Sequence, residues 1–143
     1  MDYQKYKSPS FFEAYINAFK FCYDFKGRSR RAEYWKFIGI FYLLFFILVT
    51  LLPDMYDSEY KRSFIWGLVV LVIFLLTHLL PVLSVTARRL HDSGQTSKWI
   101  IGLFIPYINF VFYIFISLFA FMDSEEEENN WGESPKYYIE NDD

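Results

Sequence analysis

The sequence has few of the residues from which soluble enzymes and secreted scaffolds build their sites. Its 143 residues contain one cysteine, Cys22, and two histidines. A lone thiol excludes an internal disulfide, and so small a set of histidine and cysteine argues against a metal site. The sequence also has no HExxH, CxxC, P-loop or glycine-rich dinucleotide motif. We therefore expect no cofactor, no metal ion and no catalytic residue.

Charge is missing from three long stretches, residues 37–53, 63–86 and 99–122, although 22% of all residues are charged. Hydrophobic residues make up 54% of the chain and aromatic residues 23%, more than a soluble domain of this size usually buries. A helix needs roughly 20 apolar residues to cross about 30 Å of hydrocarbon. The pattern predicts an all-α integral membrane protein with three transmembrane helices at 34–53, 63–86 and 99–122.

Basic residues are concentrated on two flanks of these predicted helices. Residues 1–36 carry eight basic and four acidic side chains, and residues 87–98 carry three basic side chains and one acidic side chain. Residues 54–62 carry two basic and three acidic side chains, and the tail 123–143 carries one basic and nine acidic side chains. Because cytoplasmic flanks are rich in Lys and Arg, we expect the N-terminus and the 87–98 loop to be cytoplasmic. Three crossings then place the acidic tail outside.

The segment 1–33 precedes the three-helix domain, 34–122, and is expected to hold an amphipathic helix and a basic region. Ser10 and Glu13 form a capping-box pair at the start of a helix of about 14 residues, which Gly27 can end. One interpretation places this helix on the inner leaflet with its aromatic face among the headgroups. The other packs it on the cytoplasmic end of the bundle, and the two are compatible. The apolar face consists of Phe11, Phe12, Tyr15, Ile16, Phe19, Cys22 and Tyr23.

Two arginine-rich motifs stand at the cytoplasmic ends of the predicted helices. Residues 27–35 read Gly-Arg-Ser-Arg-Arg-Ala-Glu-Tyr-Trp, and residues 88–94 read Arg-Arg-Leu-His-Asp-Ser-Gly. Lysine would anchor a helix equally well, but a guanidinium holds phosphate or carboxylate through two parallel hydrogen bonds. The motifs predict a cytoplasmic-face site for anionic lipid headgroups or a protein partner. Its residues are Arg28, Arg30, Arg31, Arg88, Arg89 and His91.

Two structural interpretations of the same residues stay open. In one, the arginines only anchor the helices at the cytoplasmic surface, and Glu33 and Asp92 neutralise their neighbours. In the other, Arg31 or Arg88 pairs with Glu33 or Asp92 and locks the loop to the first helix. His91 and Asp92 are adjacent, so on a helix their side chains point about 100° apart and form no ready-made catalytic dyad.

Three polar side chains lie at similar depths inside the predicted spans. Counted from the cytoplasmic ends, Tyr42 and His78 lie about 12 Å deep and Asn109 about 15 Å deep. Intramembrane polar groups usually bond across helices, which favours one interhelical cluster of the three. The alternative is that each bonds to its own backbone. Pro81 and Pro106 predict kinks in the second and third helices at one level.

Further short motifs complete the pattern, namely Ile105-Pro106 and Asn129-x-Trp131-Gly132-x-x-Pro135. Together with the two arginine motifs, they make the sequence resemble the bacterial inner-membrane proteins grouped as domain of unknown function 805 (DUF805). The resemblance covers the chain from Phe11 to Lys136. It implies a location in the bacterial cytoplasmic membrane and no reaction, since none is established for the group.

The sequence favours a non-enzymatic integral membrane protein that binds membrane lipids with anionic headgroups through its arginines. A membrane-protein partner or a second copy of the chain is the other expected contact, and no nucleic acid is expected. A small transporter or channel-like subunit that uses Tyr42, His78 and Asn109 is the alternative. A lipid-modifying enzyme centred on His91 comes third. In the tail, Trp131-Gly132 predicts an ordered turn that folds back toward the membrane.

Overall fold

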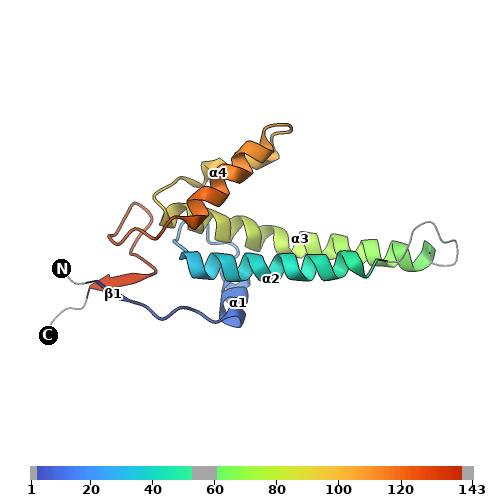
Figure 1. Ribbon diagram of the computed structural model, residues 1–143, viewed down its shortest axis with the longest axis horizontal. Coiled ribbons are helices and arrows are strands. Elements are labelled where there is room, and N and C mark those ends of the chain that lie inside the picture. The colour runs from blue at the N-terminus through green and yellow to red at the C-terminus, as the bar shows by residue number, and fades with distance from the viewer. Residues whose placement is uncertain (1–2, 53–60, 140–143) are drawn as a thin grey trace.

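Two long helices dominate the computed structural model, which describes residues 3–52 and 61–139 (Figure 1). Helix α2 runs Arg31–Thr50 and helix α3 runs Lys61–Asp92. At roughly 1.5 Å per residue they are about 30 and 48 Å long, enough to cross a bilayer core. Only 17% of the apolar window of α2 and 22% of that of α3 are buried, so neither is packed like the core helix of a soluble protein.

The first two predicted spans are therefore helices long and apolar enough to cross a membrane. The end of the first prediction, Pro53, and most of the 54–62 loop lie outside the described residues. At its other end α3 continues beyond Thr86 to Asp92. The second arginine motif thus forms the last turns of α3, where we expected a loop.

Helix α1, Phe11–Lys20, begins with the predicted capping box. The amide of Glu13 donates to Ser10 Oγ at 3.1 Å, and the amide of Ser10 donates to the Glu13 carboxylate. The helix ends before Gly27, and its small residues Ala14 and Ala18 are completely buried against the long helices. Packing on the bundle is therefore confirmed, and the opposite face leaves Phe11 and other apolar side chains exposed.

The third predicted span, 99–122, is not one helix, and the three-helix prediction is wrong in this respect. A 3₁₀ helix, η1 (Ser97–Phe104), leads away from α3, and α4 (Asn109–Phe121) returns beside it (Figure 1). With 13 residues, α4 is about 20 Å long and too short to cross the bilayer core.

The reversal between η1 and α4 follows from its proline. Ile105 precedes Pro106 and adopts extended backbone angles, φ −92° and ψ 113°, as a residue before proline prefers. Tyr107 then has φ 69°, in the left-handed region. Pro106 consequently ends the helical path and turns the chain, where we expected it to kink a continuous helix.

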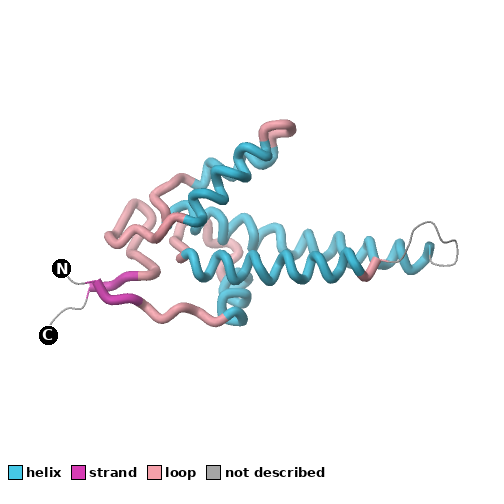
Figure 2. The backbone as a smooth tube through the Cα atoms, viewed as in Figure 1, coloured by secondary structure: helices cyan, strands magenta, loops and turns pink. Residues whose placement is uncertain are grey.

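Both described ends of the chain lie at one end of the molecule (Figure 2). Strand β1, Tyr3–Lys5, pairs antiparallel with β2, Tyr137–Ile139, so that Tyr3 faces Ile139 in the register. The prediction that the tail lies across the membrane from the N-terminus is therefore wrong. The η1–α4 hairpin returns the chain to the side on which it started.

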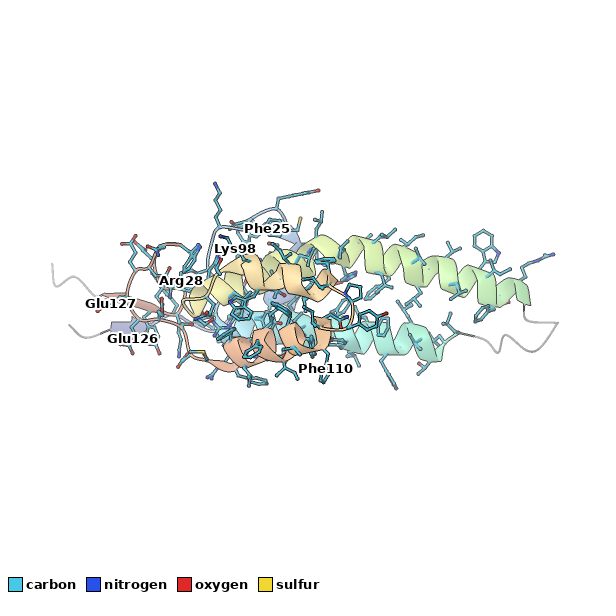
Figure 3. All side chains as sticks on the ribbon, turned by 90° about the horizontal axis from the view of Figure 1, so that it is seen from above. Phe25, Arg28, Lys98, Phe110, Glu126 and Glu127 are labelled. Atoms are coloured by element: carbon cyan, nitrogen blue, oxygen red, sulfur yellow. The ribbon has the colours of Figure 1, made fainter. Side chains whose placement is uncertain are left out.

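The hydrophobic core sits where α1, α2, α3 and α4 meet near this end. Its members are Ala18, Tyr34, Phe37, Ile38, Val85 and Ala120. Farther along α2 and α3 the apolar side chains project outward, with Phe46 66% and Leu76 65% exposed. Figure 3 shows side chains projecting around the far half of the helix pair, while Arg28, Glu126 and Glu127 lie at the opposite end. The described residues thus form one polar end and a long apolar surface along α2 and α3.

The hairpin depends on close contact at Gly102, which gives a testable prediction. A Cβ atom there would lie 2.1 Å from the Phe112 ring, whereas a Cβ at Gly39 on α2 would meet nothing within 4 Å. We expect Gly102→Ala to lower the free energy of unfolding by about 1–3 kcal/mol. The control Gly39→Ala should be neutral or stabilising by up to about 1 kcal/mol. Thermal unfolding in detergent measures both, and equal effects would contradict the close packing.

Candidate functional site: a buried arginine cluster and two surface hollows

Asp92, the last residue of α3, is completely buried and receives three side chains. Arg28 Nε donates to Oδ1 at 3.2 Å, Ser124 Oγ donates to Oδ2 at 2.6 Å, and Arg89 Nη1 also donates to Oδ2. The side chains of both arginines are only 1% exposed. We call Asp92, Arg28, Arg89 and Ser124 the Asp92 cluster. It joins three segments: the one before α2, the end of α3 and the one after α4.

The remaining guanidinium donors of the Asp92 cluster hold backbone carbonyls. Arg28 donates to the carbonyls of Glu125, Glu127 and Gly132 at 2.7, 2.9 and 3.0 Å. These bonds fix the start of the acidic tail to the polar end of the molecule. Because the carbonyls are held inward, the glutamate side chains of this segment are exposed. Arg28 therefore works as a structural connector rather than an open binding residue.

The C-terminal end of α4 is closed by side chains from the other helices. A helix leaves its last carbonyls without intrahelical partners, and cations are favourable there. Ala120 O accepts from Trp35 Nε1 at 3.1 Å and from Arg89 Nε at 3.3 Å. Met122 O accepts from Arg89 Nη2, and Phe121 O accepts from Arg31 Nη1 at 3.3 Å. The arginines thus cap the hairpin that the sequence led us to expect as a third span.

His91 fastens the tail on the other side of α3. Its Nδ1 donates to the carbonyl of Gly27 at 3.2 Å, and its ring stacks on Trp131 with centroids 4.5 Å apart and planes 9° apart. Asn129 Nδ2 donates to the His91 carbonyl at 3.0 Å. The backbones of Asn129 and Gly132 bond to each other, which confirms the predicted turn.

Arg30 and Arg88 are also turned inward. Arg30 is 9% exposed and donates to the carbonyls of Tyr6, at 3.0 Å, and Lys7. Arg88 is 4% exposed, and its guanidinium lies over the Phe21 ring at 5.7 Å. Within the described part of the chain, its Nε and Nη2 have no hydrogen-bond partner. Burial lowers the pKa of Arg30, although Glu33 opposes that shift.

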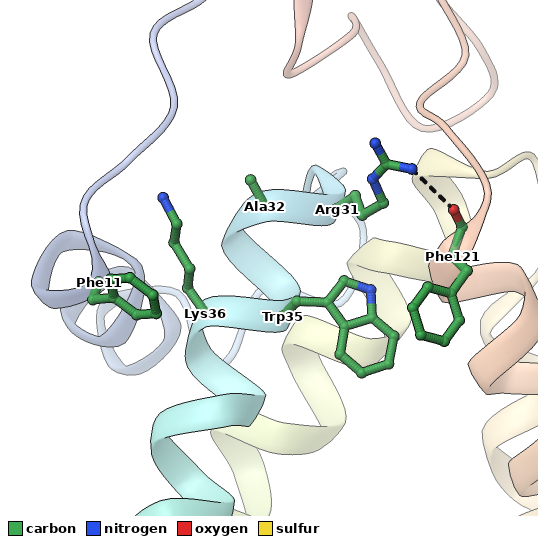
Figure 4. A pocket seen from close by; sticks show the side chains of 6 residues that line it. All are labelled: Phe11, Arg31, Ala32, Trp35, Lys36 and Phe121. Atoms are coloured by element: carbon green, nitrogen blue, oxygen red, sulfur yellow. Dashed lines mark hydrogen bonds between the residues drawn. The ribbon is translucent and has the colours of Figure 1, made fainter.

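Arg31 differs from the other five predicted binding residues because it is exposed. It lies beside an open hollow of about 500 Å³, which we call the aromatic hollow (Figure 4). Its lining residues are Phe11, Arg31, Ala32, Trp35, Lys36 and Phe121. Trp35 and Phe121 stack with ring centroids 4.4 Å apart. Lys36 Nζ donates to Ser8 Oγ at 3.2 Å and to the Pro9 carbonyl.

A smaller hollow of about 160 Å³, the polar hollow, shares Arg31 and Ala32 with the aromatic hollow. Its other lining residues are Tyr6, Ser8, Arg30, Asp123 and Lys136. Lys136 Nζ donates to both carboxylate oxygens of Asp123, and this hydrogen bonding holds the pKa of Asp123 below its usual value. Arg31 therefore stands between an apolar hollow and a charged one.

The three predicted intramembrane residues do not form one cluster. His78 Nδ1 lies 2.8 Å from the Phe74 carbonyl, so it carries the hydrogen, and Nε2 accepts from the Tyr15 hydroxyl at 2.8 Å. His78 thereby connects α3 to α1. Tyr42 on α2 is 50% exposed, and Asn109 is exposed at the start of α4. The predicted cluster fails because the chain reversal places Asn109 at the hairpin tip.

The second structural interpretation was that an arginine pairs with a carboxylate inside the protein. Asp92 does pair with arginines, but with different ones from those we expected. Its partners are Arg28 and Arg89, not Arg31 or Arg88, and Glu33 accepts from Ser29 Oγ at 2.9 Å. Sequence reasoning missed Lys36, Phe121 and Ser124. Lys36 could have been found beside the first arginine motif, but the other two reach the site only through the chain reversal. The described residues contain no group of three His, Cys, Asp or Glu that could hold a metal ion.

The neighbouring arginines at the end of α3 give a matched pair of predictions. Replacing Arg89 by Met removes the partner of a buried carboxylate, and we expect a loss of about 3–5 kcal/mol in the free energy of unfolding. Arg88→Met removes a buried charge with unmet donors and should cost less than about 1 kcal/mol. Denaturant unfolding in detergent compares the two. A loss for Arg88→Met as large as that for Arg89→Met would contradict this division.

Comparisons with known proteins place this architecture. The model of the family "Protein of unknown function (DUF805)" matches residues 22–133. The inner membrane protein YhaH of Escherichia coli strain K12 is 32% identical over 122 residues, which cover 85% of this chain and 95% of YhaH. YhaI of the same strain is 29% identical over 126 residues, which cover 86% of this chain and 95% of YhaI. No solved structure matches the chain. The chain belongs to the DUF805 family, whose curated relatives here are inner membrane proteins of E. coli.

Proposed function

We propose that the protein is a non-enzymatic, multi-pass protein of the bacterial inner membrane that binds an anionic phospholipid headgroup in the aromatic hollow. One observation carries the proposal. Of the six residues predicted to bind anions, Arg31 alone is exposed at a hollow. Its one hydrogen bond to another described residue, the carbonyl of Phe121, is 3.3 Å long. The other five, Arg28, Arg30, Arg88, Arg89 and His91, are turned inward.

The lining of the aromatic hollow suits an amphiphile. Arg31 and Lys36 supply two cations, and none of the described residues that line the hollow carries a carboxylate, so an anionic group is favoured there. Phe11, Trp35 and Phe121 supply apolar walls, and tryptophan is typical of the membrane–water boundary. The hollow lies beside the first turns of α2, at the start of its apolar stretch. A phosphate at Arg31 would thus have its acyl chains beside the exposed apolar helices.

The same proposal includes a topology. Basic residues at the polar end place that end in the cytoplasm by the positive-inside rule, with α2 and α3 crossing the membrane. The η1–α4 hairpin then enters the inner leaflet and returns, so the acidic tail is cytoplasmic as well. Tyr107, 98% exposed in the protein, would be covered by lipid at the hairpin tip.

Cysteine labelling tests this topology. In a Cys22→Ser background, we expect Ser63→Cys to react with a membrane-impermeant thiol reagent in spheroplasts, since Ser63 lies at the far end of α3. Glu133→Cys, exposed in the tail, should react only after the membrane is permeabilised. Labelling of Glu133→Cys in intact spheroplasts would overturn the cytoplasmic tail.

Native mass spectrometry of the protein extracted in mild detergent tests the headgroup site. With phosphatidylglycerol as the probe, we expect Arg31→Gln to reduce the retained lipid about fivefold, because one cation near a membrane surface contributes roughly 1 kcal/mol. The matched control is Lys26→Gln, an exposed cation on the segment before α2 that lines neither hollow.

Lys26→Gln should keep the thermal unfolding midpoint of the parent protein, and Arg31→Gln should lower it only slightly, since Arg31 is exposed and loses one hydrogen bond of 3.3 Å to the Phe121 carbonyl. Equal retention by the parent and Arg31→Gln would contradict a headgroup site at Arg31. Equal losses in Arg31→Gln and Lys26→Gln would show a general effect of surface charge and would also contradict it.

A further inference from the structure

We infer that the two hollows around Arg31 form one bipartite site for a phospholipid that carries two phosphates, as diphosphatidylglycerol does. The inference rests on the proposed function and specifies its ligand. One phosphate lies in the aromatic hollow against Arg31 and Lys36. The second lies in the polar hollow against Arg31 and Lys136.

The shared wall is the first reason. Arg31 and Ala32 line both hollows, so the two spaces adjoin at the first turn of α2. A guanidinium has donors on more than one edge and can contact phosphate oxygens on two sides. Arg31 is exposed, and within residues 3–52 and 61–139 its one hydrogen bond uses a single donor nitrogen, Nη1. A single ligand can therefore reach from one hollow to the other past Arg31.

Charge favours a second phosphate over a neutral group in the polar hollow. Its described lining residues include three cations, Arg30, Arg31 and Lys136, and one carboxylate, Asp123, so their net charge is +2. Arg30 already donates to two backbone carbonyls, so it contributes charge while Lys136 contributes donors. A glycerol headgroup would leave this charge without a counterion. An anion at this position balances it.

The difference between the hollows explains why the ligand is a lipid. The aromatic hollow is the larger, about 500 against 160 Å³, and has the apolar walls. A soluble diphosphate would fill the polar hollow and leave those walls exposed to water, whereas a lipid covers them with its glycerol and acyl carbons. Only a ligand that has both phosphates and apolar carbons can fill the polar hollow and also bury the apolar walls.

Competition in nanodiscs provides the test. The full-length protein is placed in phosphatidylethanolamine nanodiscs with diphosphatidylglycerol or phosphatidylglycerol at equal phosphate content, and the lipid retained is measured by native mass spectrometry. We expect the parent protein to prefer the two-phosphate lipid by about fivefold, the factor for one additional charge contact near the membrane surface. Inorganic pyrophosphate added to the solution should not displace it.

Two substitutions at the ion pair in the polar hollow separate charge from structure. Lys136→Gln lowers the net charge of the hollow to +1. We expect the ratio of retained diphosphatidylglycerol to retained phosphatidylglycerol to fall close to one, with phosphatidylglycerol retention unchanged. Asp123→Asn raises the net charge to +3 and should increase the preference. If the Lys136–Asp123 pair only supported the fold, both substitutions would act in the same direction.

The outcomes distinguish the inference from the proposed function. A parent preference near one, or a preference that Lys136→Gln and Asp123→Asn shift in the same direction, would overturn the bipartite site. Displacement of the lipid by pyrophosphate would overturn the lipid assignment. The proposed function fails separately, when Arg31→Gln retains as much phosphatidylglycerol as the parent protein does.

Discussion

Burying a carboxylate without partners costs several kcal/mol, and the structure meets this cost at Asp92 by bringing two arginines and a serine to one point. Each partner arrives from a different stretch of the chain. Arg89 lies one turn earlier on α3, Arg28 precedes α2, and Ser124 follows α4. The positions of α2 and of the returning hairpin relative to α3 therefore depend on one buried charge. Apolar packing around Phe37 and Val85 adds to this arrangement without fixing the direction of the tail.

The guanidinium groups also solve a problem that the chain reversal creates. A short helix that ends at the polar surface leaves carbonyls unpaired, and lipid offers them no donors. Arg89, Arg31 and Trp35 supply donors to the carbonyls of residues 120–122. A single planar group with several donors serves better here than lysine, because Arg89 binds Asp92 and three carbonyls at once. The preference for arginine that suggested lipid phosphate in the sequence thus has a second cause, the capping of backbone.

The sequence predicts the elements that depend on local or periodic signals. Charge-free runs gave α2 and α3, Ser10 and Glu13 gave the start of α1, and the motifs gave the family. The hairpin was missed because its 24-residue apolar stretch has the length of a span, and hydropathy does not distinguish one helix from two antiparallel halves. The signal was Ile105-Pro106, which we read as a kink. The sequence found the arginine motifs of the candidate site. It could not predict which arginine is open to a ligand, because the exposure of each side chain depends on the fold.

The returning hairpin also changes the meaning of the acidic tail. On the same side as the arginines, residues 125–128 would repel anionic lipid from much of the polar end. Because Arg28 binds the carbonyls of Glu125 and Glu127, the backbone of this segment is held in place, and the side chains of Glu126 and Glu127 face outward (Figure 3). The hollows at Arg31 lie at the start of α2, where Lys36 and Lys136 add positive charge. In the proposed site, repulsion at the tail and attraction at Arg31 would act together, and an anionic headgroup approaching the polar end would be directed to the side of the molecule where the hollows open.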